Sequence, residues 1–126
     1  MKFFATLLFT LSLLFTHFSS AVGLGQATLF SSLGQPLKVN ITIVDAGRLT
    51  ADDFKVIQVR PKSKAGQGTL NQDIPYRFKI VRDENQQLII QARSRGNINE
   101  PYVSFLLSLE MPNGVVSREY TLMLDL

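Results

Sequence analysis

Apolar and polar residues alternate with a period of two along most of the chain after residue 25, which predicts β-strands with one buried and one wet face. The clearest strand is Leu37–Ile43, in which Leu, Val or Ile occupies every odd position. A first strand is expected at Gln26–Phe30. It ends in the turn Ser31–Pro36, where Gly34 can adopt positive φ and the ring of Pro36 fixes the return of the chain.

A hairpin is expected where Tyr76–Ile80 and Leu88–Ala92 repeat this alternation on either side of the five-residue loop Asp83–Gln87. The register must keep the apolar residues on one face, because a slip of one residue would turn every side chain to the other face. The inner-face pairs expected from this loop length are Ile80 with Ile90 and Phe78 with Ala92.

A second hairpin turns at Met111–Gly114, whose Pro and Gly suit a type I turn followed by a residue with positive φ. We take this turn as a four-residue loop, which sets the register of the two strands. The pairs expected are Leu109 with Val116, Leu107 with Arg118, Phe105 with Tyr120 and Val103 with Leu122. Arg118 is therefore a charged residue in an otherwise apolar stripe.

The rest of the pattern contains no long helix. Thr50–Asp53 resembles a helix start with acidic residues in the first turn, but Phe54–Arg60 returns to β-branched alternation, so only one helical turn is expected. Pro61–Asp73 is rich in Gly and Pro and predicts a long mobile loop. About seven short strands joined by hairpins predict an antiparallel β-sandwich of immunoglobulin-like type, with a small barrel as the alternative.

Residues 1–21 have the pattern of an export signal: Lys2, an apolar run of thirteen residues from Phe3 to Phe15, and the small residues Ser19–Ala21. The run is shorter than the roughly 20 residues that cross a bilayer core as a helix, so cleavage after Ala21 is favoured over a permanent anchor. We therefore expect a signal peptide at 1–21, one domain at 22–126 and a periplasmic location, without membrane insertion after cleavage.

Removing this leader limits the chemistry of the remaining 105 residues. The chain has no Cys, and its one His, His17, leaves with the leader. Ser-His-Asp and Cys-His catalysis, His- or Cys-ligated metals, disulfides and lipid attachment to an N-terminal Cys are then all excluded. The net charge falls from +3 to +2, too small a surplus to indicate nucleic-acid binding. We expect no enzyme, metal or cofactor.

The remaining polar motifs have ordinary structural explanations. Asp52–Asp53 and Asp83–Glu84 are the adjacent carboxylate pairs, and each is expected at a helix start or a hairpin tip, where solvated acids are common. Gly66–Thr69 contains a pair of glycines but lacks the Lys-Ser/Thr ending of a phosphate-binding loop, and no Ser-x-x-Lys motif is present.

The outer face of the first hairpin is basic. Its register pairs Lys79 with Gln91 and Arg77 with Arg93, a like-charge pair that costs a few tenths to about 1 kcal/mol unless it is neutralised. Arg95 continues this face. Loop residues expected nearby are Arg60, Lys62 and Lys64. The face is either an ordinary solvated surface or a dock for an acidic envelope protein or an anionic envelope polymer.

Arg118 has two explanations. It forms a structural ion pair with Glu100, Glu110 or Glu119, or it is reserved for contact with another chain. We favour the ion pair.

Two sequence blocks resemble the N-terminal periplasmic domain of FimV/TspA-type pilus-assembly hub proteins. The first is Gly23–Gly25 followed by Ala27–Leu37, and the second runs from Glu100–Tyr102 to Arg118–Asp125. The resemblance implies a role in type IV pilus assembly, twitching motility and cell-pole organisation. It offers no catalytic residues. The motif residues, expected to be structural, are Gly34, Gln35, Pro36, Leu37, Pro101, Pro112, Gly114, Arg118, Glu119 and Tyr120.

Two departures from this family limit what is carried over. Members usually continue through a proline-rich linker to a peptidoglycan-binding LysM-type module and a membrane helix, so we expect either a stand-alone paralogue or a truncated copy. A Trp associated with the position before the Pro-x-Gly turn is Met111 here. The leading hypothesis is a non-catalytic periplasmic domain that binds envelope proteins of the pilus or secretion machinery. The alternative is an anionic-glycan or peptidoglycan binder.

Overall fold

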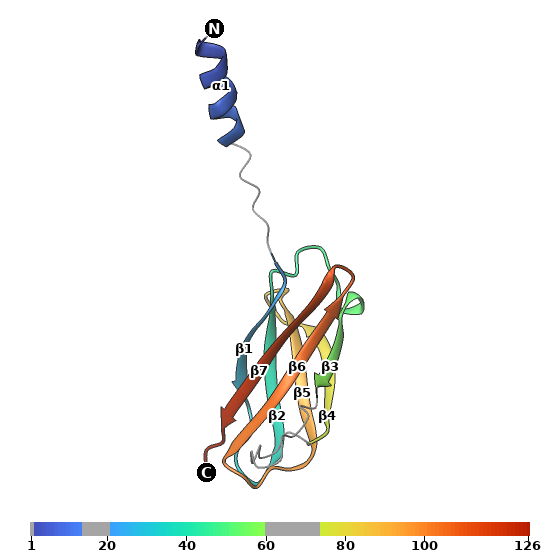
Figure 1. Ribbon diagram of the computed structural model, residues 1–126. Helices are drawn as coiled ribbons and strands as arrows, with labels where there is room; N and C mark the ends of the chain where they lie inside the picture. Colours follow the sequence, from blue (N-terminus) through green and yellow to red (C-terminus); the bar gives the residue numbers. More distant parts are fainter. Residues whose placement is uncertain (1, 14–20, 60–73) are drawn as a thin grey trace.

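Two antiparallel sheets face each other across an apolar core (Figure 1). The strands are β1 (Gly23–Leu29), β2 (Pro36–Val44), β3 (Lys55–Val59), β4 (Tyr76–Arg82), β5 (Leu88–Asn97), β6 (Tyr102–Met111) and β7 (Gly114–Met123). One sheet has the order β1-β2-β5-β4 and the other β3-β6-β7. This is the strand order of a constant-type immunoglobulin domain, so the predicted sandwich is confirmed and the barrel is not.

The computed structural model describes residues 2–13, 21–59 and 74–126. Three expectations from the sequence lie outside these residues. They are the loop Pro61–Asp73 with its glycine pair at Gly66–Thr69, the basic residues Arg60, Lys62 and Lys64, and the end of the leader with His17, Ser19 and Ser20.

The core follows from the period-two alternation. On β2, Leu37, Val39 and Ile41 are completely buried, and on β6 Leu107 is completely buried as well. The described chain contains no cysteine, so close packing of these side chains holds the two sheets together in place of a disulfide.

Three aromatic rings connect the two sheets within this core. The ring centroid of Phe105 on β6 lies 5.2 Å from that of Tyr76 on β4 and 5.6 Å from that of Tyr120 on β7. Truncating a buried ring of this kind costs about 3–5 kcal/mol, so Phe105 contributes a large share of the stability.

Both predicted hairpin registers are confirmed. In the first hairpin Ile80 pairs with Ile90 and Phe78 with Ala92. In the second, Phe105 pairs with Tyr120 and Leu107 with Arg118, Leu109 with Val116 and Val103 with Leu122. The second turn is tighter than expected, because Met111 pairs with Gly114 and only Pro112 and Asn113 form the loop.

The predicted bounds of β1 and β3 were wrong by a few residues. β1 begins at Gly23 and ends at Leu29, whereas the pattern placed it at Gln26–Phe30. Glycine is depleted in strands, but here the absence of a side chain is required, because a Cβ on Gly25 would lie 2.9 Å from the carbonyl oxygen of Thr42. β3 starts at Lys55, after Phe54.

The structure contains the turns predicted at Gly34 and at Thr50–Asp53. Gly34 has a φ of 85°, the left-handed conformation expected of it. A 3-10 helix of one turn covers Ala51–Asp53, preceded by Thr50. The Asp53 Oδ2 accepts a hydrogen bond from the backbone N–H of Thr50 at 2.8 Å, so this carboxylate caps the turn.

The N-terminal residues form helix α1 (Lys2–Leu13). Its large apolar side chains are exposed, with Phe3 at 88% and Phe4 at 76%, so they pack against no part of the sandwich. In the described part of the chain, no helix combines the length and the apolar character needed to cross a membrane.

Tyr76 gives the fold a predicted sensitivity to alkaline pH. Its hydroxyl is buried without a hydrogen-bond partner among the described residues, and burial raises its pKa from 10.0 to about 12. The folded state therefore holds this proton more tightly than the unfolded state, and stability is lost as the pH rises from 10 toward 12. Burial also raises the pKa of Tyr120, which adds to the loss.

We expect Tyr76→Phe to leave the free energy of unfolding at pH 7 unchanged or higher, because it removes an unpaired buried hydroxyl and keeps the ring. Its loss of stability above pH 10 should be shallower than that of the wild type. Urea unfolding at several pH values between 7 and 11.5 measures both. A marked loss of stability at pH 7 would show that the hydroxyl makes a stabilising contact.

Candidate functional site

The outer face of the four-stranded sheet carries a row of cations. Arg93 on β5 pairs with Lys38 on β2 on one side and with Arg77 on β4 on the other. Lys79 lies one row further along, opposite Gln91, and Arg95 lies on β5 just beyond the residues that pair with β4. We call these five residues, Lys38, Arg77, Lys79, Arg93 and Arg95, the basic face.

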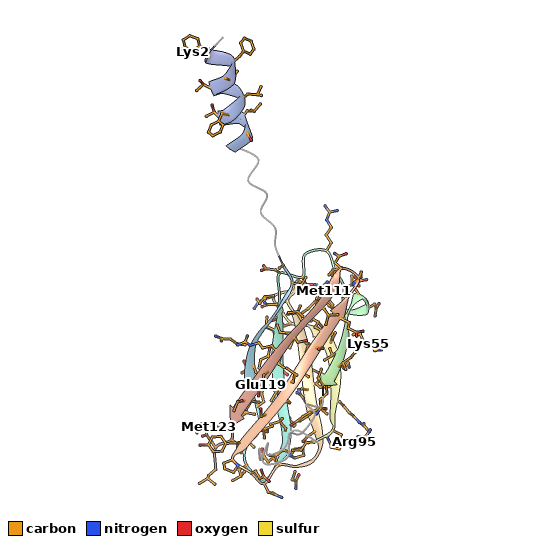
Figure 2. All side chains as sticks on the ribbon, in the orientation of Figure 1. Lys2, Lys55, Arg95, Met111, Glu119 and Met123 are labelled. Atoms are coloured by element: carbon orange, nitrogen blue, oxygen red, sulfur yellow. The ribbon has the colours of Figure 1, made fainter. Side chains whose placement is uncertain are left out.

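The structure therefore brings together the four residues that the sequence singled out, and it adds Lys38. Lys38 was missed because its place depends on the pairing of β2 with β5, strands that lie far apart in the sequence. In Figure 2 the side chain of Arg95 projects away from the body of the sandwich, at the opposite end from Met111.

No carboxylate neutralises this face from within its own sheet. None of the ten Asp and Glu residues of the chain lies in β1, β2, β4 or β5. Adjacent side chains across strands lie about 4.5–5.5 Å apart at Cβ, so the positive charges of Lys38, Arg93 and Arg77 repel one another. The repulsion favours any anion that binds there.

Arg93 is held in place by the sheet itself. Its Nη1 donates to the carbonyl oxygens of Ala92 at 2.8 Å and Val39 at 3.2 Å, and to Asn40 Oδ1 at 3.4 Å. These acceptors are neutral, so they orient the guanidinium without cancelling its charge. Arg77 and Lys79, in contrast, are exposed.

A groove of about 620 Å³ runs between these side chains. The outer-face residues that line it are Arg77, Lys79, Gln91, Arg93 and Arg95, and the lining also includes Phe78 and Ser94, whose side chains belong to the inner face. Guanidinium and ammonium groups only donate hydrogen bonds, and arginine matches planar anions with two parallel bonds. The groove is therefore suited to carboxylate, sulfate or phosphate groups.

The acidic pairs take part in turns. Asp83 Oδ1 accepts hydrogen bonds from the backbone N–H groups of Asn85 and Gln87, each at 2.9 Å. Asp53 caps its helical turn, as described above. These hydrogen bonds give Asp53 and Asp83 a local conformational role.

The predicted ion pair of Arg118 was wrong. Its Nη1 donates to the backbone carbonyl oxygens of Leu24 and Gly25 on β1, both at 3.0 Å. The Tyr120 hydroxyl donates to the same Gly25 oxygen at 2.7 Å, and the Arg118 guanidinium lies 5.1 Å from the centre of the Tyr120 ring. Arg118 thus makes a structural contact, but its partners are backbone carbonyls.

A bulge in β1 explains why these carbonyls are available. The register between β1 and β2 shifts between Leu24 and Ala27. At a bulge the ladder is interrupted, so two consecutive carbonyl groups can face the neighbouring β7. Of the expected acidic partners, Glu100 keeps a buried Oε2 without a partner among the described residues, and Glu119 accepts a bond from the Ser104 hydroxyl at 3.3 Å.

Several of the other motif residues make hydrogen bonds between segments that lie far apart in the sequence. The N–H of Gly34 donates to Ile98 O at 2.7 Å, and the N–H of Ile98 donates back to Gln35 O at 3.0 Å. The N–H of Leu37 donates to Ser94 Oγ at 2.7 Å, and that of Leu124 donates to Pro101 O at 2.7 Å. Pro36 begins β2, while Pro112 and Gly114 build the last hairpin turn.

Comparison with known proteins shows the family to which this domain is similar. The sequence model of the FimV N-terminal domain Ig-like domain matches residues 22–126. The motility hub protein FimV of Pseudomonas aeruginosa strain PAO1, and that of strain UCBPP-PA14, are each 34% identical to this chain over 116 residues. The match covers 90% of this chain but 13% of each relative. No solved structure matches.

We expect Arg118 and Tyr120 to stabilise the sandwich jointly. Tyr120→Phe should cost about 0.5–1.5 kcal/mol and Arg118→Ala about 1–3 kcal/mol, because each removes hydrogen bonds to β1 carbonyls. The double variant should cost more than the sum, since it leaves the Gly25 oxygen without either donor. Urea unfolding of the wild type, the two single variants and the double variant gives the four free energies of this double-mutant cycle.

Glu119→Ala is the matched control, because Glu119 lies between the two residues and faces away from β1. We expect it to change the stability by less than about 0.5 kcal/mol. If Glu119→Ala instead costs as much as Arg118→Ala, an ion pair and not the carbonyl contact holds Arg118.

The repulsion on the basic face should be measurable as stability. Arg77→Gln should raise the free energy of unfolding by a few tenths to about 1 kcal/mol at low salt. The gain should shrink as sodium chloride screens the charges. Lys55→Gln serves as the control, since Lys55 lies opposite Glu110 on the other sheet. If Arg77→Gln destabilises the protein at low salt, the face is not repulsive.

Proposed function

Because this chain belongs to the FimV N-terminal Ig-like domain family, we propose that it is a non-catalytic domain that binds envelope proteins in type IV pilus assembly and twitching motility. The observation that carries this proposal is the family match over residues 22–126. The relatives that share it are named motility hub proteins, and a hub acts by binding other proteins.

The proposed compartment is the periplasm. Residues 1–21 have the pattern of a signal peptide, and the family match begins at residue 22. The exposed apolar side chains of α1 support this, because a segment that contributes nothing to the core can be removed without loss of stability. Cleavage after Ala21 would leave the sandwich intact.

A binding role fits the chemistry of the domain. Residues 22–126 contain neither His nor Cys, the most common sources of general bases and thiol nucleophiles. The adjacent carboxylates Asp52–Asp53 and Asp83–Glu84 lie in local turns. What the domain offers instead is a row of cations on one sheet face, with Arg93 held in place by hydrogen bonds.

We propose the basic face as the docking surface for an acidic protein of the pilus or secretion machinery. Arg77, Lys79 and Arg95 are exposed, and Arg93 is oriented by the sheet. Complementary charges steer a partner during its approach and fix its orientation on contact. The relief of repulsion between Arg77 and Arg93 adds to the gain on binding.

The second candidate is direct binding of an anionic cell-wall glycan or peptidoglycan by the same face. The groove among the arginines favours it, because its donors suit single carboxylate groups as well as a protein surface. Binding of this kind should weaken steeply with salt. Sedimentation of the protein with purified cell walls separates this candidate from a protein partner.

In-cell crosslinking tests the proposal. The wild type and the variant Arg77→Glu/Lys79→Glu are expressed in the source cells, recovered from the periplasmic fraction, and crosslinked partners are identified by mass spectrometry. We expect pilus or secretion proteins to be crosslinked to the wild type and the yield to fall at least about tenfold in the variant, because two attractive contacts become repulsive.

The control variant is Arg48→Glu, which reverses an exposed charge in the loop after β2. It should capture the partner as well as the wild type does. Equal yields from all three proteins would contradict docking through the basic face, and recovery of the protein only from the cytoplasm would contradict the proposed compartment.

A further inference from the structure

The two side edges of the sandwich are closed to different extents. Along one edge β1 lies beside β7, and Arg118 and Tyr120 bond to the carbonyls of Leu24 and Gly25. Along the other edge β4 lies beside β3, which belongs to the other sheet (Figure 1). In the described part of the chain, only Gln58 bonds across this second edge.

Gln58 shows how the β4 edge can be occupied. Its side-chain Nε2 donates to Ile74 O at 2.7 Å, and its Oε1 accepts the backbone N–H of Tyr76 at 3.2 Å. A primary amide that donates to Ile74 and accepts from Tyr76, two residues further on, reproduces the two hydrogen bonds that one residue of an adjacent parallel strand would make. Gln58 thus imitates the first residue of a strand beside β4.

Among the described residues, the next positions of β4 have no strand paired with their outer edge. The N–H of Asp83 donates to Gln87 O at 2.9 Å, so the odd-numbered residues of β4 bond to β5. The N–H and C=O groups of the even-numbered residues, Phe78 and Ile80, therefore point away from β5. The described chain places no strand against them, because β4 is the last strand of its sheet.

A groove lies beside these outward-facing groups, and it is lined by apolar side chains together with the charged residues Asp52 and Lys55. It has a volume of about 360 Å³ and lies between β4 and the start of β3. Its lining residues are Ala51, Asp52, Phe54, Lys55, Val56, Phe78 and Ile80. Alternate side chains of a strand added to β4 would point toward this groove, since they would continue the inner face of the sheet.

The other side chains of such a strand would lie on the basic face. They would continue the cross-strand rows of Arg77 and Lys79, the two exposed cations of β4. Acidic residues at those positions would be stabilised. A second copy of this chain is disfavoured as the occupant, because two β4 edges would bring Arg77 and Lys79 of each copy together.

We propose that the β4 edge binds an extended segment of a partner protein by adding it to the sheet as a fifth strand. The segment alternates apolar residues, which face the groove, with acidic residues, which face Arg77 and Lys79. The inference rests on the proposed docking function for its assumption that the partner is a protein. Cations on a sheet edge normally deter strand pairing, and here they select an acidic strand.

Hydrogen exchange tests this assignment directly. The isotope-labelled protein, purified as the cell produces it, is mixed with a synthetic seven-residue peptide of alternating glutamate and valine, the length of β4. We expect the amide exchange of Phe78 and Ile80 to slow at least about tenfold, because the peptide supplies their missing acceptors. The amides of Arg77, Lys79 and Val81, already bonded to β5, should change much less.

Two peptides serve as controls. A peptide of alternating lysine and valine should bind at least about tenfold more weakly, because its cations meet Arg77 and Lys79. A peptide with the glutamates and valines in two separate blocks should not protect Phe78 and Ile80. Equal binding of the lysine peptide would overturn the acidic assignment.

A pair of variants isolates the backbone contribution. Ile80→Pro removes an outward N–H and leaves the bonds to β5, whereas Ile80→Ala shortens the same side chain and keeps the N–H. We expect the proline variant to bind the glutamate peptide at least about tenfold more weakly than the alanine variant. Should the proline variant not fold, the exchange measurement on the wild type still decides the question.

The remaining outcomes separate this inference from the proposed function. Binding of the glutamate peptide without protection of Phe78 and Ile80 would overturn strand addition and leave docking on the basic face standing. Failure of every peptide to bind at millimolar concentration would overturn the inference. Protection of these two amides supports it even if crosslinking finds no pilus protein.

Discussion

Arg118 and Tyr120 hold the last strand against the first, and the arrangement of both sheets depends on this contact. The two residues supply donors to backbone carbonyls that a bulge in β1 has turned away from β2. Without them, these partly buried carbonyls would lose their hydrogen bonds where β1 and β7 pack together, at a cost on the order of 1 kcal/mol for each bond. A chain with no disulfide needs such a closure, because only packing and hydrogen bonds join its sheets.

The same contact joins the two distant sequence blocks in which this chain resembles the family. Gly25 lies in the first block and Arg118 and Tyr120 in the second, and they meet at one carbonyl oxygen. Gly25 itself must lack a side chain, since a Cβ would press on Thr42 O. The blocks therefore mark the joints of the fold. The basic face lies mostly on β4 and β5, outside these blocks, so the residues that carry the resemblance and those proposed to bind a partner are separate sets.

The sequence predicted what depends on local geometry and missed what depends on distant contacts. Both hairpin registers could be predicted, because a short loop and an apolar stripe leave one consistent pairing. The pair Arg77–Arg93 followed from that register alone. Lys38 could not be added, since the pairing of β2 with β5 joins strands about fifty residues apart. The partners of Arg118 are backbone atoms exposed by a bulge, and no residue pattern in β1 indicates a bulge beyond its glycines.

Closure of one edge makes the opposite edge the place where binding is least costly. A sheet edge that is bonded by side chains, as β1 is, would have to lose those bonds before another strand could join it. Among the described residues, the β4 edge would lose only the hydrogen bonds of Gln58, since the backbone groups of Phe78 and Ile80 already face outward. The cations of β4 repel another basic strand at this edge and attract an acidic strand. The two edges of the sandwich thus differ in role: the bonded β1 edge stabilises the fold, and the open β4 edge selects the strand that can bind.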